Sequence, residues 1–105
     1  MNKKKPVKVV LKRSSKKDKK WVAIMPELGH KHHFGQKGYS DFTIHKDPKR
    51  KERYIERHRK REDWNDIHSA GFWSKHILWN KDTISKSIKD AEKKYNLDIT
   101  KKSAK

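Results

Sequence analysis

The sequence predicts an α+β fold, in which a small N-terminal antiparallel β-meander is followed by three helices. Two observations carry this prediction. Before Gly35 the apolar residues are mostly β-branched or aromatic and come in short runs separated by polar turns, as in strands. After Gly38 the apolar residues recur at helical spacing, behind residues that commonly cap helices.

The chain has 105 residues, which is enough for one domain. We expect that domain over residues 6–98, with the strands within 6–35 and the helices within 47–95. The Lys-rich ends are predicted to be a flexible basic arm, residues 1–5, and a flexible basic tail, residues 99–105. Because only 30% of the residues are hydrophobic, the core should be thin and should depend on the ten aromatic side chains.

Three short strands are predicted in order. The first is a β-branched run over residues 7–13, and the polar basic loop 14–20 follows it. The second strand is the apolar run 21–25. A turn at 26–29, marked by Pro26 and Gly29, leads into a third strand over 30–34.

The first helix should begin at Asp47 and Pro48, because a carboxylate cap followed by proline is a strong helix start. We expect it to run to about Glu62. Its apolar stripe is narrow and consists mainly of Tyr54 and Ile55. One side of this helix carries a row of cations at helical spacing, namely Lys49, Arg53, Arg57 and Lys60.

Two shorter helices complete the prediction. Ser69 is expected to cap a helix whose apolar residues are Phe72, Trp73, Ile77, Leu78 and Trp79. Asp82 or Thr83 is expected to cap the last helix, in which Ile84, Ile88, Ala91 and Tyr95 recur at helical spacing.

The charge of the chain is its strongest functional signal. Thirty Lys and Arg oppose thirteen Asp and Glu, which gives a formal net charge of +17. Such an excess favours a polyanionic partner, because cations placed along DNA release condensed counterions and gain affinity without reading sequence. We therefore predict a non-enzymatic protein that binds the phosphate backbone of double-stranded DNA, with an RNA-binding, ribosomal-type protein as the alternative.

Two segments are expected to supply the nucleic-acid contacts. The loop between the first two strands forms a basic hairpin tip that can follow phosphates or enter a groove. The helix from Asp47 adds arginines, which can make bidentate phosphate contacts. The predicted binding residues are Lys16, Lys17, Lys19, Lys20, Lys49, Arg50, Arg53, Arg57, Arg59, Lys60 and Arg61.

The aromatic residues permit two other interpretations. Bases of single strands stack on exposed aromatic rings, but Phe72, Trp73 and Trp79 lie among apolar residues and are expected to form core. Tyr39 and Phe42, in a glycine-bounded loop, are better placed for exposure, although packing is expected there too. The helical half is alternatively a self-assembly surface, in which Trp73 and Trp79 would mediate a homodimer.

The sequence predicts no metal site, no cofactor and no catalytic residue. His30 and His32 have a spacing that can chelate zinc from one side of a strand, but no Cys and no suitably placed acid completes the set. No paired carboxylates or activated nucleophile indicate an enzyme. The absence of Cys also excludes disulfides, and no apolar run reaches the roughly 18 residues of a membrane span, so no membrane partner is expected.

A set of short motifs in a fixed order resembles a family of small basic virion-associated proteins of large nucleocytoplasmic DNA viruses. The motifs are Gly38-Tyr39-Ser40-Asp41, His45-Lys46-Asp47-Pro48, Gly71-Phe72-Trp73-Ser74 and Leu78-Trp79-Asn80-Lys81. The resemblance covers residues 34–90, and His76 departs from it at a position where a large apolar residue is expected. It implies a protein associated with the viral genome, located in the virion or in the viral factory, nucleus or cytoplasm of the infected cell.

Overall fold

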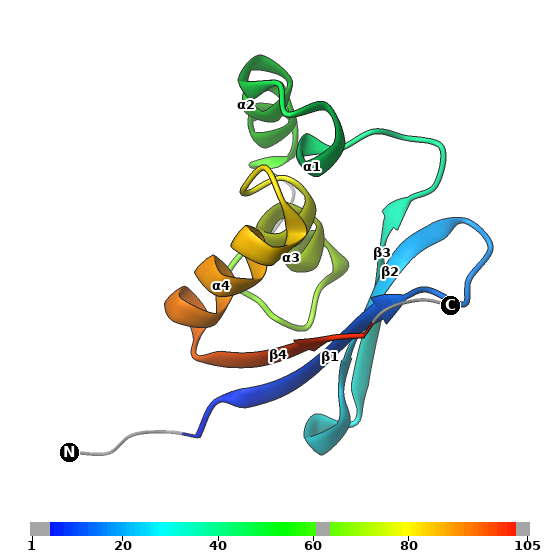
Figure 1. The fold of residues 1–105 in the computed structure, drawn as a ribbon, viewed down its shortest axis with the longest axis vertical. Coiled ribbons are helices and arrows are strands. Elements are labelled where there is room, and N and C mark those ends of the chain that lie inside the picture. Colours follow the sequence, from blue (N-terminus) through cyan, green and yellow to red (C-terminus); the bar gives the residue numbers. More distant parts are fainter. Residues whose placement is uncertain (1–4, 61–63, 103–105) are drawn as a thin grey trace.

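A computed structural model describes residues 5–60 and 64–102 of the chain. Its centre is a mixed four-stranded sheet in the order β3-β2-β1-β4, and helices pack on it (Figure 1). The predicted α+β class is confirmed. The finer arrangement differs from the prediction, because a fourth strand follows the helices.

The three predicted strands are present at the N-terminus. They are β1 (Val7–Arg13), β2 (Lys19–Met25) and β3 (His30–Gln36), joined by the β1–β2 loop and by the short 3₁₀ helix η1 (Pro26–Leu28). β1 pairs antiparallel with β2, and β2 pairs antiparallel with β3. The predicted meander is therefore correct, and β3 extends two residues beyond the predicted end.

The fourth strand, β4 (Leu97–Lys101), pairs in parallel with β1. The prediction of a flexible tail from residue 99 was therefore wrong for residues 99–101, and residues 103–105 lie outside the described part. Asn96 ends the preceding helix in the left-handed region (φ 54°) and redirects the chain along β1. Leu97 and Ile99 are then buried on alternate positions of the strand, and this burial stabilises the pairing.

Four α-helices are described where three were predicted. They are α1 (Phe42–His45), α2 (Pro48–His58), α3 (Ala70–Trp73), which continues as the π-helix η2 (Ser74–Leu78), and α4 (Ile84–Tyr95). Asp47, Ser69 and Thr83 accept backbone N–H groups at the starts of α2, α3 and α4, as predicted. None of the helices within residues 5–60 and 64–102 is long and apolar enough to cross a bilayer.

The helix α2 ends at His58, four residues before the predicted end. No apolar residue follows Ile55 until Trp64, so the sequence offers a further turn no apolar side chain to pack against the core. Arg59 and Lys60 lie in a turn, and residues 61–63 fall outside the described residues.

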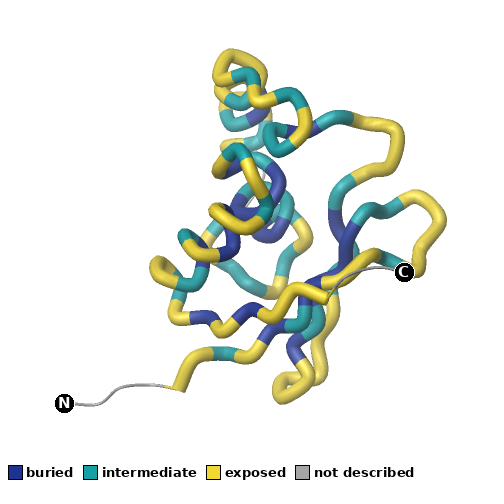
Figure 2. The backbone as a smooth tube through the Cα atoms, in the orientation of Figure 1, coloured by how far each residue is buried: buried dark blue, intermediate teal, exposed yellow. Residues whose placement is uncertain are grey.

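The core lies between the sheet and the α3–η2–α4 layer, where buried segments of both face each other (Figure 2). Phe72 and Trp73 are fully buried, so their assignment to the core is confirmed. Trp79 is partly buried and stacks on Tyr54 of α2, with ring centroids 4.3 Å apart and an interplanar angle of 2°. This stack fastens α2 to the rest of the fold. Because Trp73 is enclosed in the core, its ring is not available to a second copy of the chain.

Gly35 permits close contact between β3 and η2. Its φ is +76°, and a Cβ there would lie 2.7 Å from Leu78 Cδ1 and 3.2 Å from Lys20 Cβ. Only glycine satisfies both the left-handed backbone and the close approach.

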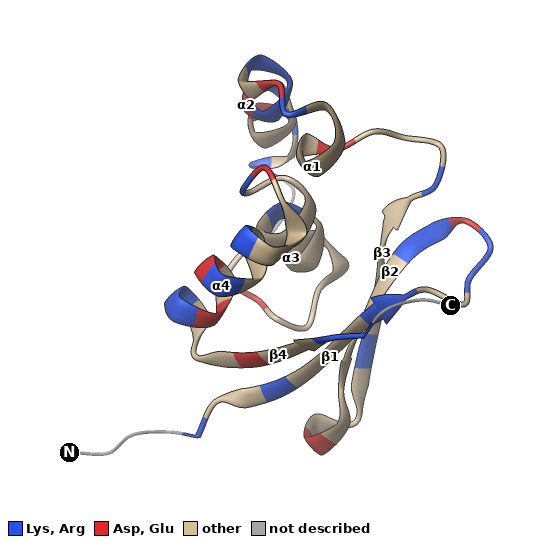
Figure 3. Ribbon diagram, viewed as in Figure 1, with Lys and Arg blue, Asp and Glu red and all other residues tan. Residues whose placement is uncertain are grey.

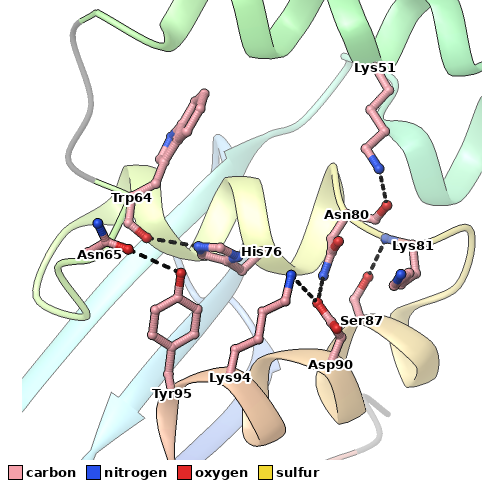
Figure 4. A network of polar contacts seen from close by, with 10 residues as sticks. All are labelled: Lys51, Trp64, Asn65, His76, Asn80, Lys81, Ser87, Asp90, Lys94 and Tyr95. Atoms are coloured by element: carbon pink, nitrogen blue, oxygen red, sulfur yellow. Dashed lines mark hydrogen bonds and ion pairs between the residues drawn. The ribbon is translucent and has the colours of Figure 1, made fainter.

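A polar network joins α2, η2 and α4 (Figure 4). Asn80 Nδ2 donates to Asp90 Oδ2 at 2.7 Å, and Lys51 Nζ donates to the Asn80 carbonyl at 2.6 Å. The hydrogen bond from Asn80, followed by contact with Lys94, lowers the pKa of the Asp90 carboxyl. Burial lowers the pKa of Lys51. The network therefore uses one α2 cation for internal structure rather than for the surface.

Candidate nucleic-acid interface

The strand register brings Lys and Arg residues from four chain segments to one end of the sheet. β1, β3 and β4 all finish at this end, and β2 begins there. Lys19 pairs with Gln36, Leu11 pairs with Lys101, and the Lys37 N–H donates to the Asp18 carbonyl at 2.9 Å. We call this cluster the basic sheet end. Its members are Lys12, Arg13, Lys16, Lys17, Lys19, Lys37, Lys101 and Lys102.

The basic sheet end has little internal neutralisation. Seven of its eight cations are exposed and Lys19 is half-buried. Asp18 is the one acid within residues 12–19, 36–37 and 101–102, which form it, whereas Asp98 of β4 pairs with Lys8 towards the other end of the sheet. Figure 3 shows Lys and Arg around the β1–β2 loop and at the end of β4. Acids are more frequent on and just before α4, where Asp82 pairs with Lys86 and Asp90 pairs with Lys94.

The β1–β2 loop is held in place by side chains. Ser14 Oγ lies 2.7 Å from His33 Nδ1 and accepts the Lys16 N–H at 2.9 Å. The Arg13 guanidinium lies 4.6 Å from the Trp21 ring centroid. Burial, followed by repulsion from Lys16, lowers the pKa of His33. These contacts preorganise the loop cations, which reduces the entropy lost when they meet a ligand.

A groove of about 400 Å³ connects the two predicted binding elements. Lys19 of β2 lines one side, and Arg57 of α2 lines the other. Tyr39 also lines the groove. Its side chain was expected to pack against the protein, but it is 67% exposed, so that prediction was wrong. Asp41 is the one acid among the residues that line the groove, and Lys20 neutralises it. The groove therefore presents uncompensated positive charge from both walls.

Lys20 was predicted to bind nucleic acid, and the structure places its ammonium in an internal ion pair instead of on the surface. Its Nζ lies 2.7 Å from Asp41 Oδ2, and the two side chains are only 13% and 3% exposed. Asp41 also caps α1 by accepting the Thr43 N–H at 3.0 Å. The ammonium of Lys20 is therefore committed to an internal ion pair, which the position of Lys20 in a basic run could not reveal.

The predicted cations of α2 have different surroundings. Lys49, Arg50, Arg53 and Arg57 are exposed, and the described residues place none of them in an ion pair. Arg57 lines the groove, whereas the other three do not. Arg59 and Lys60 are exposed beyond the helix end, and Arg61 lies outside the described residues. The exposed acids Glu52 and Glu56 lie on the same helix, so α2 is a weaker source of net charge than the sheet end.

The sequence prediction missed five members of the basic sheet end as binding residues. These are Lys12, Arg13, Lys37, Lys101 and Lys102. They are distant in sequence and become neighbours only through the strand register. The sequence signal that could have identified them is the lysine or arginine near the end of each strand. This signal predicts a cluster only once the parallel β1–β4 pairing is known.

Part of the chain is similar to a known family. Residues 9–58, from β1 to the end of α2, match the model of a family of unknown function (DUF5754). The matched segment contains the β1–β2 loop and α2, and with them Lys19 and Arg57 of the groove, whereas the groove residues of α3 and η2 lie outside it. No curated protein and no solved structure matches the chain.

Proposed function

We propose that this protein is a non-enzymatic, largely sequence-independent DNA-binding protein that coats or compacts double-stranded DNA. The observation that supports it best is the basic sheet end, where eight cations from four segments surround a single acid. Cations in such a cluster attract phosphate and release the counterions condensed on DNA. Nothing in this contact requires a base edge, so we expect little sequence preference.

The groove adds a second contact region to this proposal. Arg57 of α2 and Lys19 of β2 line the same groove, so a phosphate backbone crossing the sheet end would meet cations of α2 next. The guanidinium of Arg57 can bind one phosphate with two hydrogen bonds. We propose that the backbone runs from the basic sheet end along this groove, with Tyr39 beside the sugars.

The family resemblance over residues 34–90 suggests which nucleic acid the protein binds in the cell. It supports a protein of a large nucleocytoplasmic DNA virus that acts on the viral genome, in the virion or in the infected cell. We propose that genome as the target, and compaction as the result of many copies covering it.

A salt-titrated binding assay tests the proposed function. The protein is titrated onto two unrelated duplexes, a single strand and a structured RNA, at equal phosphate and at sodium concentrations from about 50 to 200 mM. We expect a linear fall of log K with log salt, with equal affinities for the two duplexes and weaker binding of the other ligands. Preference for the structured RNA would favour the ribosomal-type alternative, and salt-independent or absent binding would overturn the proposal.

A further inference from the structure

Three histidines from two distant segments meet beside the first residues of β3. His30 and His32 belong to β3, and His68 belongs to the turn before α3. Each offers one ring nitrogen, and these three atoms lie within 4.8 Å of one another. The ring centroids of His30 and His68 are 4.3 Å apart, and those of His32 lie 6.2 Å from both.

The fold itself produces this meeting. Alternate residues of a strand face the same side, so His30 and His32 share the helix-covered side with Phe34, whose ring lies 6.4 Å from that of Trp73. The turn that carries His68 is fixed next to them, because Trp73 Nε1 donates to the Ile67 carbonyl at 2.9 Å. The core therefore brings β3 and the turn of His68 together independently of any ligand.

Asp66 fixes the His68 backbone in the same turn. Its Oδ1 accepts the His68 N–H at 2.9 Å, and its carbonyl accepts the Ser69 hydroxyl at 3.0 Å. The Asp66 carboxylate also lies near His32. A carboxylate beside a histidine cluster is a common outer partner of metal-bound imidazoles, which it orients.

A second observation indicates a missing partner at this position. Nε2 of His32 is buried and has no hydrogen-bond partner among the described residues. Buried ring nitrogens normally have one. Nε2 of His32 is therefore available as a metal ligand.

We propose that His30, His32 and His68 bind one divalent transition-metal ion, with zinc as the expected occupant. Tetrahedral zinc with bonds of about 2.0–2.1 Å needs its nitrogens roughly 3.3 Å apart. The nitrogens must therefore approach by about 1.5 Å, which side-chain rotation can supply because His30 and His68 are exposed. Three imidazoles leave the fourth position to water. The ion would tie the turn before α3 to β3.

This site is separate from the proposed nucleic-acid interface. His30 begins β3 and Gln36 ends it at the basic sheet end, so six residues of strand place the two sites about 20 Å apart. Metal binding and DNA binding are therefore expected to be lost independently.

Metal titration of the full chain tests the proposal. Chelator-treated protein is titrated with zinc sulfate in a calorimeter at pH 7.5, and with cobalt(II) while the visible absorption is recorded. We expect one equivalent of zinc per chain, a tetrahedral cobalt spectrum and a zinc-dependent rise in melting temperature. Loss of an outer partner already costs about 10–100-fold in affinity, so His68→Ala should weaken binding at least about 100-fold.

His33→Ala is the matched control, because His33 lies on the opposite side of the same strand and outside the cluster. It should keep the full zinc affinity. Because His68 is exposed, His68→Ala should remain folded, and circular dichroism can verify this. The proposal is overturned if the dissociation constant for zinc is about 1 mM or higher, near the weak end of specific association. It is also overturned if His68→Ala and His33→Ala bind zinc with equal affinity.

Discussion

Nζ of Lys20 lies 2.7 Å from Oδ2 of Asp41 in an ion pair that is nearly closed to solvent. The adjacent Lys19 lines the groove and is in no ion pair within the described residues. Two neighbouring lysines of β2 therefore have opposite roles, one holding the 39–46 segment to the sheet and the other facing the proposed ligand.

Substitution of each lysine separates these roles. Lys20→Gln should lower the free energy of unfolding by about 3 kcal/mol, because it leaves the Asp41 carboxylate buried without its partner. Lys19→Gln should leave stability within about 0.5 kcal/mol and should reduce the salt slope of DNA binding by up to about 0.9. Chemical denaturation and salt-titrated binding measure the two effects. Equal destabilisation by both substitutions would refute the assignment.

The α2 arginines can be tested by charge reversal. Arg53→Glu with Arg57→Glu should weaken duplex binding and lower the salt slope by about 2, if each arginine contacts one phosphate. The control is Lys89→Glu with Lys93→Glu, which makes the same charge change at exposed positions of α4. If the α2 variant keeps the wild-type slope, the helix is not part of the interface.

His76 makes the fold sensitive to acid. Its ring is buried between Phe72 and Tyr95, and Nε2–H donates to the Trp64 carbonyl at 2.8 Å. Burial lowers the pKa of His76 from 6.5 to about 4, against the opposing effect of the Trp64 hydrogen bond. The unfolded chain thus binds the proton more tightly, so the contribution of neutral His76 is complete above pH 6.5 and declines as the pH falls toward 4.

This decline should amount to about 3 kcal/mol of unfolding free energy. His76→Phe, which cannot be protonated, should lose correspondingly less stability between pH 6.5 and 4 when both proteins are denatured with urea at constant salt. If the unfolding free energy of the variant falls between pH 6.5 and 4 by as much as that of the wild type, other groups cause the acid sensitivity.

Gly35→Ala tests the contact between β3 and η2. The substitution combines a left-handed backbone with a clash against Leu78, and should lower the unfolding free energy by about 2–4 kcal/mol. Gly29 has a similar φ of +67° and nothing within 4 Å of its Cβ position. Gly29→Ala should therefore show only the backbone cost, about 1–2 kcal/mol. Equal losses in the two variants would mean that the clash relaxes without cost.

Local patterns were sufficient to predict most of the fold. The β-branched run of β1, the turn at Pro26 and the caps Asp47 and Ser69 act within a few residues, and each element formed where its pattern indicated. β4 was missed because only Leu97 and Ile99 mark it, and its parallel pairing with β1 depends on contacts across the whole chain.

The candidate sites were harder to predict for the same reason. Composition indicated a polyanionic ligand, but the role of Lys20 depends on Asp41, 21 residues away. The basic sheet end depends on the β4 pairing, and the histidine cluster depends on His68, which the chain brings to His30 and His32 only after α2. Long-range packing determines which charged side chains become neighbours.

We expect DNA binding to depend on the position of the cations and not on the net charge alone. Two triple variants of equal net charge test this dependence. The first, at the basic sheet end, is Lys17→Gln/Lys37→Gln/Lys101→Gln. The second, on and before α4, is Lys81→Gln/Lys89→Gln/Lys93→Gln, and all six lysines are exposed. The sheet-end variant should lower the slope of log K against log salt by up to about 2.7, while the other variant should keep the wild-type slope. Identical slopes in the two variants would mean that the basic sheet end is not the DNA-binding surface.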